Sequence, residues 1–468
     1  MTTDHARVRR AAGALIGSVV GDALGAPFEF GPPGQFSARF PVAARGVQTE
    51  MCGNRLWQPG EWTDDTQMAL LVAQSLGTRD GLDEADLFDR FRQWAAAGPK
   101  DVGIQTAAVL GSGRPWDVAA SEHFAAGGRA AGNGSLMRTT PAAIWFSCSG
   151  TDATMDAARA ISALTHGDPS AGEGCAIFHE LVRVALDGGD PLAAVAPTLD
   201  VVAPEHRERW ATVLAPTWTP EQASEVNGAV WPTVGSAVWA LRVSTSFEEA
   251  MRLVIDLGGD TDTVAAVTGG LVGAVVGIAG IPSRWASAVH GTLPGFESPV
   301  THLGHLHELA ERLDGGRGTA YSAPAQVPLG PTEIADGLWA ANLDGAAAAA
   351  TSVDDSFAVI SLCRTDGRLG SGVQQWTYLT DDESNTELRH VLDDVLDDIT
   401  SLRADGQRVL VHCFAGASRT GLVLRAWLMR EQGMSLEQAT AYVGERWPHL
   451  SLWNDAFTKA LHDLDGDR

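Results

Sequence analysis

Two short clusters of oxygen-bearing side chains, far apart in the chain, are the strongest candidates for chemistry. Both combine aspartates with threonines, and the residues concerned are Thr63, Asp64, Asp65, Asp260, Asp262 and Thr263. Neighbouring ionised carboxylates repel each other unless a cation joins them. Because neither cluster contains histidine or cysteine, their oxygen atoms suit Mg²⁺, Mn²⁺ or Ca²⁺ rather than zinc. The clusters therefore predict a divalent-metal site, in which two ions bridged by carboxylates are feasible.

Each cluster stands directly before an apolar segment with helical spacing, and these helices must bring the clusters together. Aspartate and threonine are also favoured helix N-caps, so capping is the alternative for either cluster taken alone. Two oxygen-only clusters, each leading into a buried helix, favour the metal site. Glycine recurs at every fourth position of the first helix and of the second apolar helix, at Gly13, Gly17, Gly21, Gly25, Gly269, Gly273 and Gly277. Since glycine costs a helix about 1 kcal/mol relative to alanine, these stripes predict a close approach of two backbones.

A second chemical centre, containing Cys413 and Arg419, lies near the other end of the chain. The run His412-Cys-Phe-Ala-Gly-Ala-Ser-Arg-Thr420 follows a short apolar strand and precedes a helix, an arrangement whose backbone amides can hold a phosphate. The helix N-terminus and the arginine favour a thiolate at Cys413, which can attack phosphorus while Arg419 binds two phosphate oxygens. A loop hydroxyl could assist the departing thiolate, and the positions expected to contact the phosphate are Gly416, Ser418 and Thr420. The alternative, a buried structural cysteine, leaves the loop unexplained.

Composition and charge limit the class of protein. The chain has 468 residues, 45% of them hydrophobic, and this length exceeds what one hydrophobic core usually serves, so two domains are expected. A formal net charge of −25 argues against non-specific binding to nucleic acid or to an anionic membrane. Five scattered cysteines without a Cys-x-x-Cys pair argue against a disulfide framework or a cysteine zinc site, and a reducing cytoplasm is the expected location.

Two apolar stretches resemble membrane segments. Residues 11–20 follow three arginines, as in a secretory signal, but the stretch is short and Asp22 and Glu29 come soon after it. Residues 264–282 carry no charge and are long enough to span a bilayer, but they are rich in glycine and stand alone. Buried helices are the better interpretation of both.

The pattern of apolar residues changes after residue 313. Helical spacing dominates before that point and predicts a mostly α-helical domain over 1–313. Glycine, proline and small residues crowd 314–331, which predicts a linker. The remainder, 332–468, is predicted to be an α/β domain. Its strands are expected at 357–363 and 408–412, and its helices at 387–402, 420–432 and 436–446. Its acid-rich stretch 381–398 is expected to form a solvated helix face.

Short polar motifs follow one another along the N-terminal domain. They are Gly21-Asp-Ala-Leu-Gly25 with Glu29, Trp62-Thr-Asp-Asp-Thr66, Asp101-Val-Gly-Ile-Gln-Thr106, Asn133-Gly-Ser-Leu-Met-Arg138 and Gly258-Gly-Asp-Thr-Asp-Thr263. Together they resemble the ADP-ribosylglycohydrolase family. The resemblance implies an all-α fold, hydrolysis of an ADP-ribosyl bond, and two Mg²⁺ ions (or Mn²⁺) held by the two oxygen clusters. Cleavage at the anomeric carbon of ribose needs an oxocarbenium-like transition state and an activated water, which bound metal ions would orient.

The resemblance also assigns roles to further acidic residues. Glu29, just beyond the first helix, is expected to act as a general base or proton shuttle, while Asp22 supports that turn. Asp101 matches a family position linked to substrate handling and is counted among the catalytic candidates. A turn aspartate is the alternative for Asp101.

The substrate pocket is expected around the turn formed by Asn133, Gly134 and Ser135. Backbone N–H groups of this turn can face a diphosphate, and Met137 would line the pocket. Arg138 is expected to pair with phosphate or with one of the many carboxylates. His166, in Thr165-His-Gly-Asp168, also matches a recurrent segment of the family; a helix C-cap is the alternative, and His166 is left out of the core of the site.

The loop around Cys413 is similar to that of the dual-specificity and tyrosine phosphatases. Asp336-Gly-Leu-Trp339 and residues 357–363 match the strands that lead to such a loop, and the resemblance covers roughly residues 332–465. The family also needs a general acid for the leaving oxygen. Asp382 matches that position best and Asp381 is the alternative, in a loop that lacks the usual proline.

These features predict a bifunctional hydrolase. One domain would remove ADP-ribose from protein arginine or from an ADP-ribose-containing small molecule, and the other would dephosphorylate a phosphorylated substrate. One alternative is an ADP-ribosyl hydrolase whose C-terminal domain only binds phosphate groups or docks a partner. Others are a hydrolase of free or phosphorylated ADP-ribose and a non-enzymatic ADP-ribose-binding protein. Neither a nucleic-acid scaffold nor a membrane is expected as a partner.

Overall fold

The computed structural model divides the chain into two units, each described here by itself. The described residues are 5–41, 50–127, 131–297, 301–315, 326–351, 357–365, 368–370, 372–383, 385 and 388–466. A helical unit contains 5–41, 50–281 and 288–315, and a second unit contains 326–466 together with 282–287. Residues 316–325 of the predicted linker lie outside the described residues, so the limits of the linker stay a prediction.

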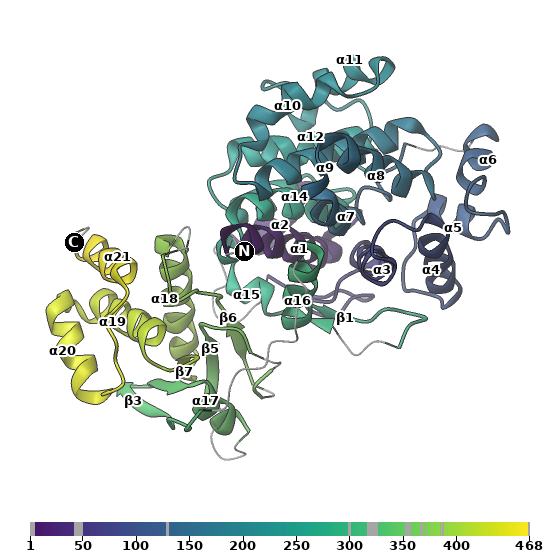
Figure 1. Ribbon diagram of the computed structural model, residues 1–468. Coiled ribbons are helices and arrows are strands. Elements are labelled where there is room, and N and C mark those ends of the chain that lie inside the picture. Colours follow the sequence, from purple (N-terminus) through teal and green to yellow (C-terminus); the bar gives the residue numbers. More distant parts are fainter. Residues whose placement is uncertain are drawn as a thin grey trace. The chain divides into compact units, whose positions relative to one another are not determined.

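Helices α1 (His5–Gly25) and α14 (Thr261–Val276) form the centre of the helical unit (Figure 1). Their backbones touch along the glycine stripes. A Cβ atom added at Gly13 would lie 2.2 Å from the carbonyl oxygen of Gly273, and one at Gly21 would lie 2.0 Å from that of Ala265. This confirms the predicted close approach of the two helices. The segment beginning with α1 is long and apolar enough to cross a membrane, but 94% of its apolar window is buried within the protein.

The remaining elements of the helical unit surround this pair, with α9, α12 and α13 packed on α14, and α3, α7 and α16 packed on α1. They are α2 (Gln35–Arg39), α3 (Asp64–Arg79), α4 (Glu84–Ala96), α5 (Ile104–Leu110), α6 (Ala119–Ala125), α7 (Thr140–Phe146), α8 (Thr151–Ala163), α9 (Pro169–Leu186), α10 (Pro191–Asp200), α11 (Pro204–Val213), α12 (Val230–Val243), α13 (Phe247–Ile255) and α16 (Leu303–Leu313). A two-residue antiparallel ribbon, β1 (His290–Gly291) with β2 (Thr301–His302), is the only strand pairing in the described part of this unit. The fold is therefore α-helical, as predicted.

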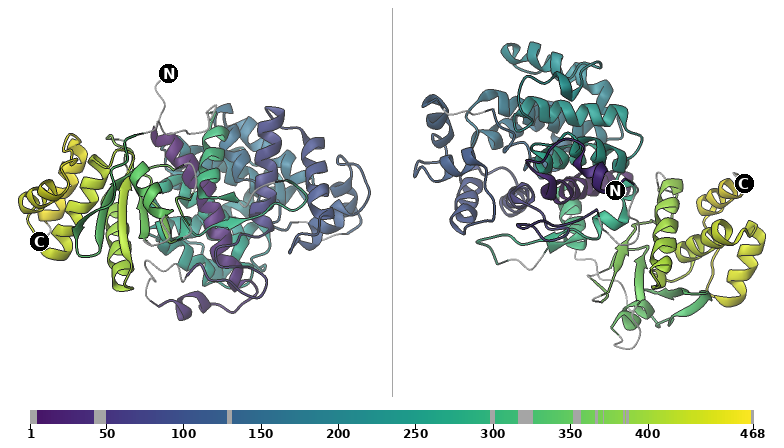
Figure 2. Two further views of the ribbon diagram at one scale, coloured as in Figure 1. Left: turned by 90° about the horizontal axis from the view of Figure 1, so that it is seen from below. Right: turned by 180° about the vertical axis from the view of Figure 1, so that it is seen from behind.

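The second unit is built on a five-stranded sheet with the order β3-β4-β7-β5-β6. Its strands are β3 (Thr332–Ala335), β4 (Leu338–Asn342), β5 (Phe357–Ser361), β6 (Gln374–Trp376) and β7 (Arg408–Cys413). All neighbours are parallel except β3 and β4. Figures 1 and 2 show α18 (Leu388–Ala404), α19 (Ser418–Gln432) and α20 (Leu436–Arg446) on one side of the sheet, with α21 (Asp455–Gly466) packed on α19, and α17 (Leu343–Ala350) on the other side. The α/β prediction is confirmed.

A short helix from an earlier part of the sequence, α15 (Ser283–Ala286), completes the second unit. The backbone amide of Ser283 donates to Asp394 at 3.1 Å, and its hydroxyl donates to Asp398. Both aspartates are buried on α18. The expectation of a fully solvated acidic face over 381–398 is therefore wrong for these two residues, because α15 supplies donors to them.

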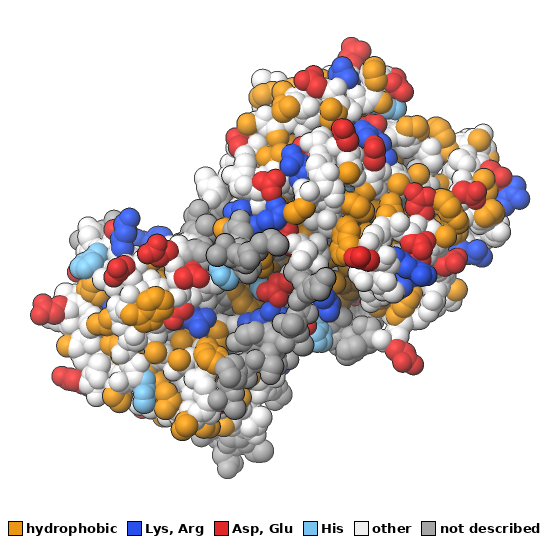
Figure 3. Space-filling model, in the orientation of Figure 1, with side chains coloured by type: hydrophobic (Ala, Val, Ile, Leu, Met, Phe, Trp, Pro, Cys, Tyr) orange, Lys and Arg blue, Asp and Glu red, His pale blue; other side chains and the backbone are white. Residues whose placement is uncertain are grey.

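Figure 3 draws one face of the molecule, on which acidic, basic and apolar side chains are interspersed. Much of the apolar content lies inside, where the largest fully buried side chains include Trp62, Trp94 and Trp210. The helices that carry the chemical residues are thus anchored in a well-filled core.

Candidate active sites

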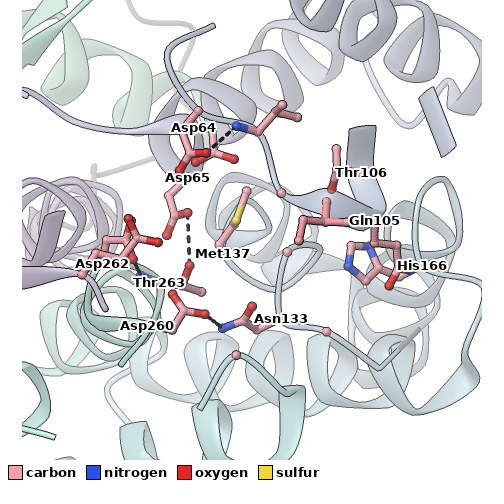
Figure 4. Close-up of a pocket in the computed structure, with 18 of the residues that line it drawn as sticks. Asp64, Asp65, Gln105, Thr106, Asn133, Met137, His166, Asp260, Asp262 and Thr263 are labelled. Carbon is pink, nitrogen blue, oxygen red and sulfur yellow. Dashed lines mark hydrogen bonds between the residues drawn. The ribbon is translucent and has the colours of Figure 1, made fainter. Parts of the chain in front are cut away.

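A pocket of about 360 Å³ lies where the N-terminal ends of α3, α5 and α14 converge. Figure 4 shows its carboxylates gathered on one side, with Met137 between them and a second polar group around His166. The structure brings most predicted site residues of this domain to the pocket wall, namely Glu29, Asp64, Asp65, Asp101, Asn133, Gly134, Met137, Asp260, Asp262 and Thr263. Thr63 and Ser135 are buried and are not among the residues that line the pocket.

The two oxygen clusters meet directly at this pocket. The hydroxyl of Thr263 donates to Oδ1 of Asp65 at 3.3 Å. Carboxylate oxygens of Glu29, Asp260 and Asp262 lie within 4.8 Å of one another. Glu29 therefore stands beside the predicted metal ligands of the second cluster, close enough to act on the same substrate atoms.

Helix capping explains part of the first cluster but not the second. Thr63 is the N-cap of α3, and its hydroxyl accepts a hydrogen bond from the backbone of Asp65 at 3.3 Å. Asp260 occupies the N-cap position of α14 but accepts no capping hydrogen bond. Its Oδ2 instead accepts from Nδ2 of Asn133 at 2.8 Å. The side chain of Asn133 thus orients a carboxylate, while the contact of this turn's backbone with a diphosphate stays a prediction.

Asp22 holds the start of α3 against α1. Its carboxylate accepts from the backbone amides of Thr63 and Thr66 at 3.1 Å and from the hydroxyl of Thr66 at 2.6 Å. Burial raises the pKa of Asp22 to about 6, although these hydrogen bonds act in the opposite direction. Asp22 was expected to support its own turn, whereas it fixes the helix that presents Asp64 and Asp65.

The carboxylates of the pocket share an environment that disfavours negative charge. Burial raises the pKa of Asp64 to about 7 and that of Glu29 to about 8, and in both cases repulsion from Asp101 adds to the effect. Burial and neighbouring carboxylates also raise the pKa values of Asp65 and Asp262 well above the ordinary range. A cation among these groups would relieve the repulsion.

The donor set fits a hard divalent cation. Oδ2 of Asp65 is buried and has no hydrogen-bond partner, so one lone-pair face of this carboxylate is left for another ligand. Around it the pocket offers carboxylate and hydroxyl oxygens, the donors that Mg²⁺ and Mn²⁺ prefer. The residues that would hold such ions are Thr63, Asp64, Asp65, Asp260, Asp262 and Thr263.

The second polar group of the pocket contains His166, Gln105 and Thr106 (Figure 4). A Cβ atom added at Gly134 would lie 3.2 Å from Cε1 of His166, so only glycine leaves the imidazole in its place. His166, which was left out of the core of the site on sequence grounds, therefore lines the pocket. The hydroxyl of Ser135 faces away from the pocket, toward Ser162 at 2.8 Å. Only the backbone of Ser135 can therefore contribute to binding.

Two exposed apolar side chains, Phe30 and Ile104, also line the pocket. They are 83% and 91% exposed. Phe30 adopts a left-handed backbone (φ 59°), and its amide donates to the carbonyl of Gly259 at 2.6 Å. This conformation is unfavourable for a non-glycine residue and is common at functional sites. Sequence reasoning missed both residues because nothing in their local pattern distinguishes an exposed apolar side chain from a core one.

The second candidate site is the loop between β7 and α19. Cys413 ends β7 and Arg419 lies in the first turn of α19. Gly416 has a left-handed φ of 70°, and a Cβ there would lie 2.8 Å from the carbonyl oxygen of Ala341. Nε1 of Trp447 donates to the carbonyl of Gly416 at 2.7 Å. The loop is therefore held in one tight conformation by backbone contacts.

Side chains behind the loop are also fixed. Nε2 of His412 lies 2.7 Å from the hydroxyl of Ser361, and burial lowers the pKa of His412 to about 4, so its imidazole is neutral. The hydroxyl of Thr420 is buried without a hydrogen-bond partner, and Ser418 is also buried.

The loop that carries the predicted general acid adjoins Arg419. Nη1 of Arg419 donates to the carbonyl of Leu379 at 2.9 Å. Nδ2 of Asn385 donates to the carbonyl oxygens of Thr380 and Asp382, at 2.8 and 3.1 Å. Arg419 and the segment of Asp382 are thus linked through the backbone, while the role of Asp382 as general acid stays a prediction.

Comparisons with known proteins agree with this architecture. The family model for ADP-ribosylglycohydrolase matches residues 3–323, and the model for the dual specificity phosphatase catalytic domain matches residues 344–465. ADP-ribosylarginine hydrolase Tri1 of Pseudomonas putida is 29% identical over 305 residues, which span 61% of this chain and 76% of the relative. ADP-ribosyl-[dinitrogen reductase] glycohydrolase of Rhodospirillum rubrum is 30% identical over 282 residues, 59% of this chain and 89% of the relative.

A solved ADP-ribosylglycohydrolase-related protein complex aligns with 66% of this chain and 98% of its own, with 33% identity and a TM-score of 0.53. Dual specificity protein phosphatase 1 of Arabidopsis thaliana is 38% identical over 84 residues, 18% of this chain and 42% of the relative. The carboxylate pocket lies inside the first matched region and the Cys413 loop inside the second. Through its helical domain the chain belongs to the ADP-ribosylglycohydrolase family, and a dual-specificity-phosphatase-like domain follows this domain in the sequence.

Proposed function

We propose that the helical domain removes ADP-ribose from protein arginine with the help of two Mg²⁺ or Mn²⁺ ions. The observation that carries this proposal is the joined carboxylate cluster, in which Oδ2 of Asp65 faces no protein partner. Arginine as the acceptor is supported by the similarity to ADP-ribosylarginine hydrolase Tri1. Hydrolysis of a free or phosphorylated ADP-ribose is the other reaction to be tested.

Different residues of the pocket have different roles in hydrolysis. Bound metal ions would orient the ribose hydroxyls and make the attacking water a better nucleophile. The water oxygen forms a bond to the anomeric carbon as the bond from that carbon to the acceptor nitrogen breaks. The carboxylate of Glu29 takes the proton from the water and returns it to the departing nitrogen. Asp101, close enough to Glu29 to raise its pKa, is suited to hold a positively charged guanidinium.

The test offers the full-length protein a choice of substrates with Mg²⁺ present. Peptides ADP-ribosylated on arginine or serine, ADP-ribosylated nucleic acid and free ADP-ribose are compared by the rate at which product appears. We expect the arginine adduct to be hydrolysed fastest. Failure on every substrate, with metal shown to be bound, would refute the glycohydrolase assignment.

We also propose that the second domain is an active cysteine phosphatase. The match to the dual specificity phosphatase catalytic domain supports this assignment, together with the order of strand, Cys413 loop and helix, in which Arg419 lies in the first turn of α19. A reducing cytoplasm, proposed from the cysteine usage, would keep Cys413 available. A domain that binds a phosphorylated partner without turning it over is the alternative outcome.

A further inference from the structure

Arg138 is a buried cation with no carboxylate partner among the described residues. Its side chain is 0% exposed, and Nη2 donates to the hydroxyl of Thr165 at 2.8 Å and to the carbonyl of Ile161 at 3.1 Å. Nε and Nη1 have no hydrogen-bond partner, and the guanidinium lies 4.5 Å from the ring centre of Phe91. Burial lowers the pKa of Arg138 to about 10, so it remains charged at neutral pH. A buried charge without a counter-ion is costly, so an anion bound nearby would stabilise it even without touching the guanidinium.

The hydrogen bonds around Thr165 determine the proton positions on His166. The two Nη2 hydrogens of Arg138 are used by Thr165 and Ile161, so the hydroxyl oxygen of Thr165 is an acceptor there. Nδ1 of His166 lies 2.8 Å from the same oxygen. Within the described residues it is the one acceptor for the hydroxyl proton. Nδ1 therefore accepts, and the single ring proton sits on Nε2.

His166 presents this Nε2–H group to the pocket. A Cβ added at Gly134, which lines the pocket, would lie 3.3 Å from Nε2. Burial, reinforced by the charge of Arg138 and then by His123, lowers the pKa of His166 to about 3, so the ring stays neutral. The pocket thus has two chemically different regions. One gathers carboxylates, and the other offers a neutral N–H donor with a guanidinium behind it (Figure 4).

We propose that Arg138 is a positioning residue for the diphosphate of the ADP-ribosyl substrate. Through Thr165 it holds His166 as a fixed Nε2–H donor toward the diphosphate, and its unpaired charge is the counter-charge for that group. This inference rests on the proposed ADP-ribosyl hydrolysis and adds to it the means by which an acidic pocket accepts a dianion. Arg138 itself touches no substrate, because it is fully buried.

The first test determines which ring nitrogen of His166 carries the proton, in the absence of substrate. In ¹⁵N-detected NMR of the full-length protein, a His166→Gln variant assigns the His166 signals. We expect a pyrrole-type Nε2 and a pyridine-type Nδ1 in the wild type. Thr165→Val removes the hydroxyl and should give a mixture of tautomers, whereas Thr165→Ser keeps the hydroxyl and should preserve the wild-type pattern. A pyrrole-type Nδ1 in the wild type would overturn the assignment.

The second test measures binding of ADP-ribose and of adenosine in the presence of Mg²⁺. Thr165→Val should weaken ADP-ribose about tenfold, the size of one hydrogen bond to a charged group, and leave adenosine unchanged. Thr165→Ser should restore the affinity. Arg138→Met should weaken ADP-ribose further and Arg138→Lys less, with folding checked by thermal unfolding. If Arg138→Met fails to fold, the two Thr165 variants still decide the question.

The two proposals fail in different ways. Wild-type protein that neither binds nor hydrolyses ADP-ribosyl compounds would refute the proposed function. Wild-type protein that binds ADP-ribose while Thr165→Val binds it equally well would overturn only the role of Arg138 and Thr165. Equal losses for ADP-ribose and adenosine would also overturn it, since they would indicate a general disturbance of the pocket. A rise in KM with an unchanged kcat in Thr165→Val would support a positioning role.

Discussion

Thr263 donates a hydrogen bond to Asp65 across 3.3 Å, although the two residues are 198 positions apart in the sequence. This contact uses Oδ1 of Asp65 and leaves Oδ2 free and buried. We predict that Asp65→Asn abolishes binding of Mg²⁺ or Mn²⁺, measured by calorimetry, and slows ADP-ribosyl hydrolysis on the order of a hundredfold or more, because several kcal/mol of stabilisation are lost. Asp156→Asn is the control, since the Asp156 side chain is 74% exposed and pairs with Arg159 at the surface. Metal binding that survives Asp65→Asn would contradict the proposed site.

Metal-free protein is predicted to lose stability as pH rises. The folded pKa of Asp64 is about 7 and that of Glu29 about 8, both above their ordinary values of 3.8 and 4.5. The folded state therefore binds more protons than the unfolded state between these values, and the associated stability is lost as pH rises through the folded pKa. We expect the Tm in EDTA to fall between pH 5 and pH 8, and Mg²⁺ to raise it most at pH 8. A metal-free Tm that is constant or rises over this range would contradict the prediction.

The contact between α1 and α14 should not tolerate a side chain at its centre. Gly21→Ala would place a Cβ 2.0 Å from the carbonyl oxygen of Ala265, where backbone has to move. We expect a loss of several kcal/mol in the free energy of unfolding, or no folded protein. The matched control is Gly77→Ala on α3, where a Cβ meets nothing within 4 Å. That change should stabilise the protein by up to about 1 kcal/mol, as measured by denaturant titration.

Turnover of an aryl phosphate should depend on the thiol of Cys413. Cys413→Ser replaces the nucleophile in the same place and is expected to abolish activity, and Arg419→Lys should lower it strongly because lysine cannot bind two phosphate oxygens in a fork. Cys148→Ser is the control, since Cys148 is an exposed cysteine in the helical domain. Unchanged turnover in Cys413→Ser would exclude the thiolate mechanism. No turnover in the wild type would favour a phosphate-binding module.

The link between α15 and α18 can be tested with one hydroxyl group. Ser283→Ala removes the donor to the buried carboxylate of Asp398. We expect the second unit to lose about 1–3 kcal/mol of unfolding free energy, the contribution of a hydrogen bond to a charged, buried carboxylate. The control is Asp393→Asn on the same helix. Asp393 pairs with Arg389 at the surface, so its replacement should change stability by less than about 0.5 kcal/mol. Equal effects of the two variants would contradict the role given to α15.

Residue types alone predicted the parts of the molecule whose chemistry admits few solutions. Glycines spaced by four imply a backbone contact, and the structure has this contact at Gly21. The two oxygen clusters were expected to meet, and Thr263 does reach Asp65, while the metal ions they would hold stay a prediction. The surroundings of Asp398 could not be predicted, since charge patterning says nothing of a donor 115 residues earlier. The same holds for His166, whose proton depends on hydrogen bonds made by tertiary packing around Thr165.

The position of α15 has a consequence for the order of events during synthesis. Ser283 leaves the ribosome before its acceptors Asp394 and Asp398, which lie 111 and 115 residues later. Until α18 has been made, the amide and hydroxyl of Ser283 lack the carboxylates that accept from them in the folded protein. The hydrogen bonds that hold α15 on α18 therefore form only after residue 398 has been synthesised, and the second unit stays incomplete, and open to misfolding, until then.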